Sequence, residues 1–330
     1  MADHDLQGGR SGTGRQLDPL GVVHGASSHH VASLGAMTVM VTGASGVLGH
    51  AVVGALLARD EVRATVRRPA AAESLRGLGA KVAVVDPHRS DELAEVLPRC
   101  HTLVHLIGGV RQPDPEAMFW ANHGSVELAI EAAREVGTKR FVLVSVPGAD
   151  PETTHPFLRA KGMAEAAVAA AGIEHAIIRS THAYGLGGLW FTALVQGATA
   201  TPPFVCGPGS QPVAPVLADD VVAVVAAIDD HAGPLSGTWG IEGPDVVSAD
   251  QLVGLLRADD AAPAHADGQP AAAVLTELLE TPIDAVTASF FAMPSRSDQP
   301  DAAEAFGVRR TSLVDGLRAT LAAADAGNAG

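Results

Sequence analysis

The chain has 330 residues, of which 47% are hydrophobic and only 4% aromatic, and its formal net charge at pH 7 is −15. An acidic protein repels phosphate backbones, so the composition argues against a nucleic-acid partner. The low aromatic content argues against a β-sandwich and against a surface on which bases stack.

The cysteines and the apolar runs bear on whether the protein has disulfides, a zinc site or a membrane span. Cys100 and Cys206 are the only cysteines and lie far apart, so neither a disulfide framework nor a zinc site is indicated. The longest apolar runs are well short of the roughly 18 residues that span a bilayer. We therefore expect a cytoplasmic protein that does not insert into membranes.

Residues 1–36 show no signal-peptide pattern and no strand or helix period, and they predict a disordered extension. The histidines in this segment have no rigid frame to fix a ligand geometry, so we expect no metal site. Met37 stands directly before the first strand and is a candidate natural start. We expect a dinucleotide-binding domain over residues 37–184, and over residues 185–330 a mixed segment with a substrate lobe and elements that complete the sheet.

The most informative stretch is MTVMVTGASGVLG, residues 37–49, in which a β-branched strand runs into three glycines and then into an apolar helix. Gly43 suits the positive φ of a sharp turn, Gly46 lets the main chain approach a pyrophosphate, and Gly49 lets the helix pack on the strand. The helix N-terminus then offers free amides to the phosphates. We predict a dinucleotide site here, the alternative being a glycine-rich turn without a ligand. The loop residues Ser45 and Val47 are expected to share in it.

Strands and helices then alternate along the chain. Further strands are predicted at residues 62–68, 81–86, 101–109, 139–146 and 174–180. Helices are predicted at residues 71–79, at 90–100 with Ser90 as the cap, at 118–137 and at 157–172. Strands joined by crossover helices form a parallel sheet with right-handed connections. The pattern predicts an α/β fold, a Rossmann-type doubly wound parallel sheet.

Beyond residue 185 the pattern loosens into proline- and glycine-rich loops. A helix is expected at residues 218–230, a strand-like segment at 237–243, a helix at 248–257, and two final helices after a Pro/Ala/Asp stretch at 258–270. Loops over the carboxyl edge of a sheet are where substrates bind. We therefore expect a small C-terminal substrate lobe and a small-molecule substrate.

The end of the second strand bears on the choice of cofactor. An acidic residue there hydrogen-bonds the ribose 2′-OH, whereas an arginine accepts a 2′-phosphate. The strand ends in Arg67 and Arg68, whose guanidinium forks match a phosphate, so NADP(H) is favoured over NAD(H); the alternative is that they are solvated surface charges. Asp86, after the third strand, either bonds the adenine amino group or caps the turn made with Pro87.

Seven motifs together resemble one superfamily. They are TGASGVLG, VRR, VVD, HLIGG, RFVLVSV, FLRAK and RSTHAYG, and the resemblance covers roughly residues 37–245. In this combination the chain resembles the atypical and extended short-chain dehydrogenase/reductases, especially the NmrA-like NAD(P)-binding group. The resemblance implies that Ile107 and Gly108 of HLIGG also contact the cofactor, and that the long helices pair two subunits in a homodimer.

The resemblance also implies catalytic positions. In catalytic members a Ser or Thr after the fifth strand orients a carbonyl, and a Tyr-x-x-x-Lys pair supplies a proton and clamps the ribose. Ser145 and Lys161 stand at the matching places, but the tyrosine position is Phe157. Phenylalanine has no proton to donate, so the usual general acid is missing.

Other groups are candidates for the missing acid. They are Tyr184, the single tyrosine of the chain, and the histidines His155 and His182; the alternatives are a packing residue and solvated histidines. The first function hypothesis is an NADP-dependent oxidoreductase or redox-assisted isomerase acting on a small organic substrate. The second is a dinucleotide-binding redox sensor or accessory subunit without turnover. A third is a lyase or cyclase that keeps only the scaffold.

Overall fold

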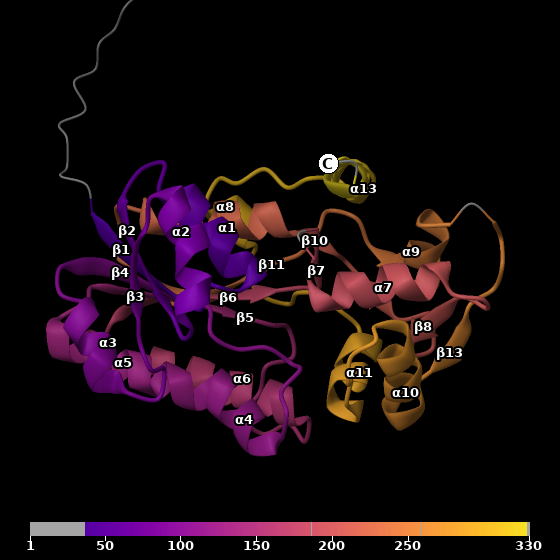
Figure 1. Cartoon of the computed structure of the whole chain (residues 1–330), viewed down its shortest axis with the longest axis horizontal. Coiled ribbons are helices and arrows are strands. Elements are labelled where there is room, and N and C mark those ends of the chain that lie inside the picture. The colour runs from indigo at the N-terminus through magenta and orange to yellow at the C-terminus, as the bar shows by residue number, and fades with distance from the viewer. Residues whose placement is uncertain (1–36, 186, 258, 329–330) are drawn as a thin grey trace, which may run out of the picture. The chain divides into compact units, whose positions relative to one another are not determined.

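Seven parallel strands form the central sheet, in the order β3-β2-β1-β4-β5-β6-β11 (Figure 1). The first six are β1 (Thr38–Thr42), β2 (Glu61–Val66), β3 (Lys81–Val84), β4 (Cys100–His105), β5 (Arg140–Ser145) and β6 (Glu174–Ser180). The seventh, β11 (Ser236–Ile241), comes from the C-terminal half of the chain and pairs with β6 from His175 to Ser180. The predicted doubly wound fold is confirmed, and the strand order reverses between β1 and β4, where such sheets bind ligands.

The computed structural model describes residues 37–185, 187–257 and 259–328. The extension expected over residues 1–36 lies outside them. Within the described residues, no helix combines the length and the apolar character that a membrane crossing needs.

Helices cover both faces of the sheet (Figure 1). One face carries α1 (Val47–Leu56), α8 (Ala218–Asp229) and, after a short turn at η1 (Pro69–Ala71), α2 (Ala72–Leu78); the other carries α3 (Ser90–Val96), α5 (Ser125–Val136) and α6 (Pro156–Ala169). Alternate residues of a strand point to opposite faces. Val39 and Val41 of β1 accordingly pack with α1 and α8, whereas Met40 packs on the other side, in the cluster of α5 and α6. Both faces are buried, as parallel sheets require.

Two of the expected helices differ in detail. The predicted long helix is α4 (Pro115–Phe119), one π-helical turn at η2 (Trp120–Gly124) and then α5, which ends at Gly137 with a φ of 73°. The predicted cap at Ser90 is wrong, because α3 begins at Ser90 itself and the preceding Arg89 makes no side-chain cap bond. The Arg89 carbonyl accepts the first helical hydrogen bond, from the Leu93 amide at 3.4 Å, so Arg89 takes the N-cap position through its backbone alone.

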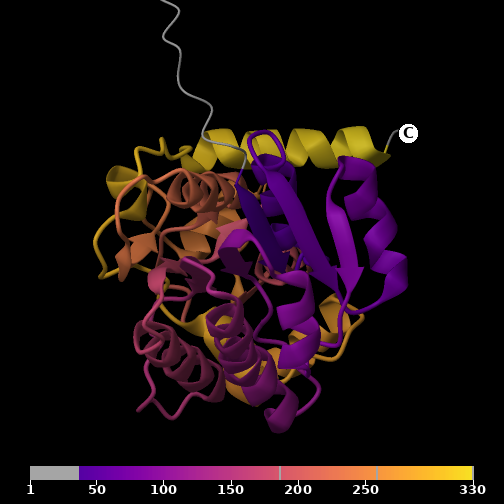
Figure 2. The same cartoon turned by 90° about the vertical axis from the view of Figure 1, so that its left-hand side faces the viewer.

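The C-terminal half builds a lobe beside the carboxyl ends of the strands. Its helices are α7 (Leu189–Thr199), α9 (Ala249–Leu255), α10 (Gly268–Leu278) and α11 (Ala285–Ala292). Short strands pair within this half: β7 (Ala183–Tyr184) with β10 (Val216–Leu217), β8 (Phe204–Cys206) with β13 (Ala264–Ala266), and β9 (Pro212–Val213) with β12 (Val247–Ser248). Within residues 259–328 the structure has four helices where two were expected, and the last two are α12 (Ala302–Ala305) and α13 (Leu313–Asn328). Figures 1 and 2 place α13 on the side of the sheet that carries α8.

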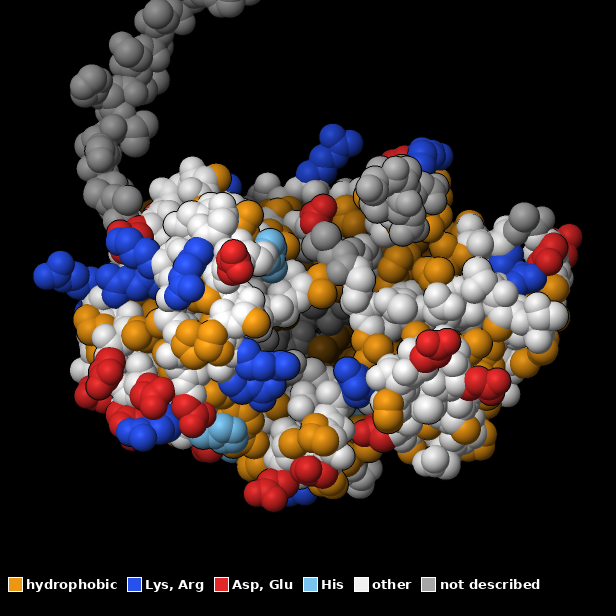
Figure 3. Space-filling view, viewed as in Figure 1, with side chains coloured by type: hydrophobic (Ala, Val, Ile, Leu, Met, Phe, Trp, Pro, Cys, Tyr) orange, Lys and Arg blue, Asp and Glu red, His pale blue; other side chains and the backbone are white. Residues whose placement is uncertain are grey.

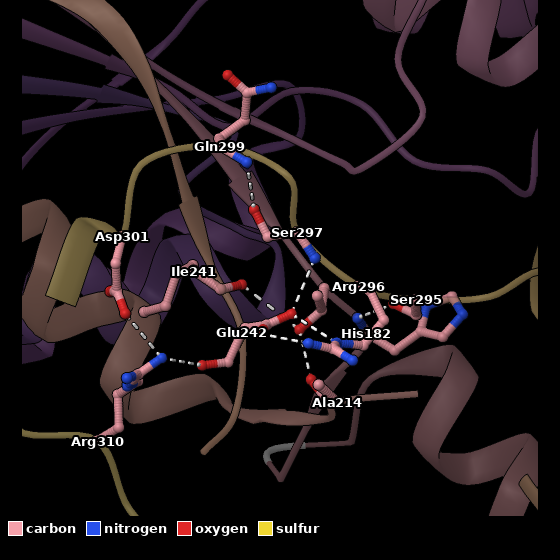
Figure 4. Close-up of polar contacts among 11 residues, drawn as sticks. His182, Ala214, Ile241, Glu242, Ser295, Arg296, Ser297, Gln299, Asp301 and Arg310 are labelled. Atoms are coloured by element: carbon pink, nitrogen blue, oxygen red, sulfur yellow. Dashed lines mark hydrogen bonds and ion pairs between the residues drawn. The ribbon is translucent and has the colours of Figure 1, made fainter. Parts of the chain in front are cut away.

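Residues 293–301, here called the strap, return from α11 to the sheet. Ser295 pairs with Val213, and its hydroxyl accepts a hydrogen bond of 2.9 Å from the His182 amide. Glu242, just after β11, accepts two hydrogen bonds from Arg296, at 2.9 and 3.1 Å, and one of 2.9 Å from the Ser297 amide (Figure 4). The strap therefore fixes α11 over the carboxyl ends of β5 and β6.

Candidate functional site

The glycine loop between β1 and α1 is packed so closely that side chains do not fit. Gly43 has a φ of 72°, and a Cβ there would lie 2.6 Å from the carbonyl carbon of Leu106. A Cβ on Gly49 would lie 2.3 Å from the Gly43 carbonyl oxygen. The first turn of α1 has no side-chain cap and no acidic residue. Its amides and its positive dipole end are thus available to a phosphate, so the loop fits a pyrophosphate.

A cavity of about 740 Å³ opens at this loop. Its walls come from the ends of β1 to β4 and from the segment running from Gln112 to Leu128. Figure 3 shows this face of the molecule hollowed between the sheet elements and the lobe that carries α7 and α10. Six of the predicted cofactor residues line the cavity: Gly43, Ser45, Gly46, Arg67, Ile107 and Gly108.

The other predicted cofactor residues do not line this cavity. Gly49 is buried beneath the loop, whereas Val47 and Arg68 are exposed outside the cavity. Asp86 accepts a 3.0 Å hydrogen bond from the His88 amide. This is the turn-capping role that the sequence offers as the alternative to an adenine contact.

Asn122 is a residue that the sequence analysis misses. It is fully buried; its Oδ1 accepts from the Gly109 amide at 2.9 Å, and its Nδ2 donates to the Gly109 carbonyl at 3.0 Å. A Cβ on Gly108 would lie 2.7 Å from the same Oδ1. Asn122 therefore holds the loop after β4 against the cavity. The available signal was a polar residue on the same helix face as the apolar residues Met118 and Val126.

His105 at the end of β4 joins three elements beneath the cavity. Its Nδ1 lies 2.9 Å from Thr42 Oγ1, and its Nε2 lies 3.2 Å from Ser125 Oγ. Because Ser125 donates to the Ala121 carbonyl at 3.0 Å, we assign the imidazole proton to Nε2. Burial, aided by the charge of Lys161, lowers the pKa of His105 to about 3. The imidazole is neutral at pH 7 and ties β1, β4 and α5 together.

Ser145 and Lys161 lie near the carboxyl end of β5, away from the cavity lining. Lys161 is buried and its Nζ donates to the Val144 carbonyl at 2.8 Å; burial lowers its pKa to about 8. The Ser145 hydroxyl is buried and has no hydrogen-bond partner among the described residues.

Phe157 lies one helical turn before Lys161, in an apolar cluster. It is buried and meets Phe290 of α11 edge-on, with ring centroids 4.9 Å apart. The other residues of the cluster are Met118, Leu158, Val110, Val146, Val286 and Met293. The position where the superfamily has a phenol is thus filled by apolar packing between α6 and α11.

The candidate replacement acids are also engaged in packing. His182 stacks on Trp190 at 4.6 Å and meets Phe290 edge-on at 5.1 Å, and burial lowers its pKa to about 3. His155 caps α6, accepting a hydrogen bond from the Leu158 amide. These two residues lie beside α11 and not in the cavity lining.

Tyr184 lies elsewhere, on β7. It is buried in the cluster that joins α7 to α13, and a Cβ on Gly316 would lie 1.9 Å from its hydroxyl. Burial, together with the charge of Asp220, raises its pKa to about 12. It does not line the cavity, and its surroundings match the packing alternative.

The NAD(P)H-binding family matches residues 43–185, from the first glycine of the loop to the end of β7. Residues 43–185 form an NAD(P)H-binding domain. Among the described residues, no cluster of His, Cys, Asp or Glu side chains could hold a metal ion beside it. The glycine loop and the cavity both belong to this domain, which agrees with the fit of the loop to a pyrophosphate.

Known proteins resemble the NAD(P)H-binding domain in different settings. NADH dehydrogenase (ubiquinone) 1 alpha subcomplex subunit 9 from Arabidopsis thaliana is 28% identical over 236 residues, which cover 68% of this chain and 58% of that protein. A ceramide reductase from Caulobacter vibrioides is 31% identical over 202 residues, 60% of this chain and 59% of that protein. The chain therefore spans less than two thirds of the length of either relative.

Solved structures extend the match beyond the NAD(P)H-binding domain. UDP-glucuronic acid 4-epimerase from Bacillus cereus aligns with a TM-score of 0.68 and 19% identity, over 86% of this chain and 98% of that one. At this identity the match establishes the fold alone. The fold is that of the extended short-chain dehydrogenase/reductases, and the resemblance found in the sequence is confirmed.

Proposed function

We propose that this protein binds an NAD(P)H-type dinucleotide as a held ligand and does not carry out tyrosine-dependent hydride transfer. The packing of Phe157 against Phe290 carries the proposal. A hydride transfer to a carbonyl needs a proton donor beside the oxygen, and a phenyl ring in an apolar cluster supplies none. The role that remains is that of an accessory subunit or sensor that uses its ligand for stability or signalling.

The Arabidopsis relative supports this proposal, since its name makes it a subunit of a larger complex. Measurements of dinucleotide binding and of dinucleotide oxidation distinguish this proposal from an oxidoreductase and from a protein that binds no dinucleotide. Purified protein should bind NADPH or NADH in calorimetry, and should oxidise neither in the presence of aldehydes, ketones or quinones. Failure to bind either dinucleotide would overturn the proposal, as would steady oxidation with one member of the panel.

A second candidate is an NADP-dependent oxidoreductase or redox-assisted isomerase. It is supported by two buried polar groups without a partner among the described residues, Ser145 Oγ and His182 Nε2, which lie near the ends of neighbouring strands. In that case His182 orients the substrate and Lys161 clamps the ribose. His182→Ala would then abolish turnover, whereas Tyr184→Phe would leave it unchanged.

The remaining expectations stay proposals. NADP(H) is preferred to NAD(H), because Arg67 lines the cavity and no acid ends β2. The protein acts in the cytoplasm, binds no nucleic acid, and forms a homodimer through α5 and α6. Sedimentation of the full chain tests the dimer, and a single species of monomer mass would overturn it.

A further inference from the structure

We infer that the C-terminal lobe has a second ligand site, a small apolar cavity that binds an apolar molecule with one hydroxyl group, which donates a hydrogen bond to Gln211. This lobe cavity, of about 30 Å³, lies among α7, α9, α10, α11 and the short strands β8 and β9 (Figure 1). None of the described residues lines both the lobe cavity and the cavity at the glycine loop. The inference is therefore independent of the proposed dinucleotide binding.

Almost all of the wall of the lobe cavity is apolar. Trp190, Phe204 and Phe291 contribute aromatic rings, and alanine, valine and leucine side chains complete the wall. Cys206 adds a thiol, and burial raises the pKa of this thiol to about 12, so it is uncharged at pH 7. Such a wall favours an apolar occupant, because contact with it removes apolar surface from water.

Gln211 is the exception in this wall. Its side chain is buried, its Nε2 donates to the Cys206 carbonyl at 2.6 Å, and its own carbonyl accepts from the Ala249 amide at 3.2 Å. The bond to the Cys206 carbonyl settles which end of the side-chain amide is the donor. The acceptor end, Oε1, is buried and has no hydrogen-bond partner among the described residues. A buried acceptor of this kind costs free energy until a donor reaches it.

The turn after β8 holds the Gln211 amide in place. Gly207 has a φ of 83°, and a Cβ there would lie 2.9 Å from Gln211 Nε2 and 2.9 Å from the Ala292 carbonyl oxygen. Glycine therefore lets the turn close against both Gln211 and the end of α11. The orientation of the free acceptor is fixed before any ligand arrives.

Water is the simplest alternative occupant, and the wall suits it poorly. The lobe cavity has about twice the room that one water needs, but a buried water makes two to four hydrogen bonds. Among the described residues that line this cavity, the polar side chains are those of Gln211 and Cys206, and a thiol bonds only weakly. A molecule with one hydroxyl group on an apolar body satisfies Oε1 and places its remaining atoms against the apolar wall.

Tryptophan fluorescence tests the site, because Trp190 lines the lobe cavity and the other two tryptophans, Trp120 and Trp239, do not. The probe is 2,2,2-trichloroethanol, whose chlorine atoms quench indole emission. In the full-length W120F/W239F variant it should quench Trp190 along a saturating curve, with a dissociation constant of about 1 mM. The matched probe 1,1,1-trichloroethane lacks the hydroxyl group and should bind about tenfold more weakly, the effect of one lost hydrogen bond. Quenching that rises linearly without saturation, or equal affinity for the two probes, would overturn the inference.

Two substitutions in the W120F/W239F background separate the hydroxyl contact from the apolar wall. Gln211→Met keeps a side chain of similar length without the acceptor, so it should bind both probes with equal affinity. Ala193→Leu fills the lobe cavity from α7 and should abolish saturable quenching by either probe. Circular dichroism confirms that each variant is folded. A folded Gln211→Met that still prefers the alcohol tenfold, or a folded Ala193→Leu that still binds it, would overturn the inference.

Discussion

The two ends of the NAD(P)H-binding domain differ in what they offer a ligand. At the glycine loop, a Cβ on Gly43 or Gly49 would collide with backbone, and the first turn of α1 is free of competing acids. At the other end, Phe157, Phe290 and Met118 fill the space with apolar packing. The first end is built around a ligand, and the second is built around its own side chains.

The difference separates binding from chemistry. Binding of a pyrophosphate at the glycine loop requires only the backbone geometry of the loop and the N-terminus of a helix. Hydride transfer requires in addition a proton donor at one fixed point. Under the proposed function, a chain that keeps the glycine loop and replaces the proton donor holds the dinucleotide as a bound component. Variants at each end test whether binding and chemistry are separate in this protein.

The largest effect is expected at the glycine loop. Gly49→Ala puts a methyl group 2.3 Å from the Gly43 oxygen and 2.8 Å from the Ala44 Cα. Both atoms belong to the backbone, so the loop must move. We expect a loss of about 3 kcal/mol in the free energy of unfolding and a more than hundredfold weaker binding of NADPH.

Gly54→Ala is the matched control on the same helix. A Cβ there meets nothing within 4 Å, so this variant should gain about 0.5 kcal/mol, since alanine favours a helix interior over glycine. Urea unfolding and calorimetry measure both variants. If Gly49→Ala and Gly54→Ala have the same stability and the same affinity for NADPH, the site does not depend on the close packing of the loop.

The second experiment reopens the apolar end. Phe157→Tyr alone should give no activity, because Phe290 still packs against the ring at position 157. Combined with Phe290→Ala, it should give NADPH-dependent reduction of a generic aromatic ketone. Removing the half-buried Phe290 side chain should cost about 2 kcal/mol.

Phe291→Ala is the control, because Phe291 packs in the cluster of α7 and α10 and not against Phe157. Combined with Phe157→Tyr it should stay inactive. Inactivity of F157Y/F290A in a folded protein would show that the apolar end has lost more than a phenol, and activity of Phe157→Tyr alone would show that Phe290 covers nothing.

The sequence predicted these two ends unequally. The glycine loop is a local feature, and its strand, turn and helix can be recognised in about twenty residues. The absence of a phenol at Phe157 is equally local. What covers that position is not, because Phe290 lies more than a hundred residues downstream and contacts Phe157 only through the fold of the lobe. The π-helical turn at Trp120 could not be predicted, because the sequence pattern of this segment is also that of an ordinary helix.

Asp86 illustrates a different limit. Its two predicted roles, adenine contact and turn cap, need the same residue type, and only the 3.0 Å bond from the His88 amide favours one of them. Tyr184 was ambiguous for the same reason, since burial beside α13 cannot be read from RSTHAYG.

A third experiment concerns Arg67, which lines the cavity near the glycine loop. Arg67→Asp should weaken NADPH binding about tenfold more than NADH binding, because a guanidinium fork pairs with the 2′-phosphate that only NADPH carries. Arg68→Asp is the control, since Arg68 is equally exposed but does not line the cavity. Equal weakening of both dinucleotides by Arg67→Asp would leave the arginine without a role in cofactor choice.

The smallest effect is expected at the strap that holds α11 over the apolar end. Burial alone raises the pKa of Glu242, but the hydrogen bonds from Arg296 and from the Ser297 amide outweigh it and hold the pKa below its ordinary value of 4.5 (Figure 4). A carboxyl whose pKa is lowered by folding stabilises the protein above the unfolded value, and that contribution disappears as the pH falls through the folded value. Glu242→Gln should therefore cost about 1 kcal/mol at pH 7.

Measured by urea unfolding, the difference between wild type and Glu242→Gln should shrink as the pH falls below about 4.5. Glu95→Gln, a change at an exposed glutamate of α3, should cost nothing at either pH. If the difference in the free energy of unfolding stays constant from pH 7 to pH 3.5, Glu242→Gln destabilises the protein through its altered shape and not through the lost carboxylate charge. Loss of the Glu242 hydrogen bonds should also loosen the strap and make Phe290 easier to displace. The double variant F157Y/E242Q should therefore show weak ketone reduction.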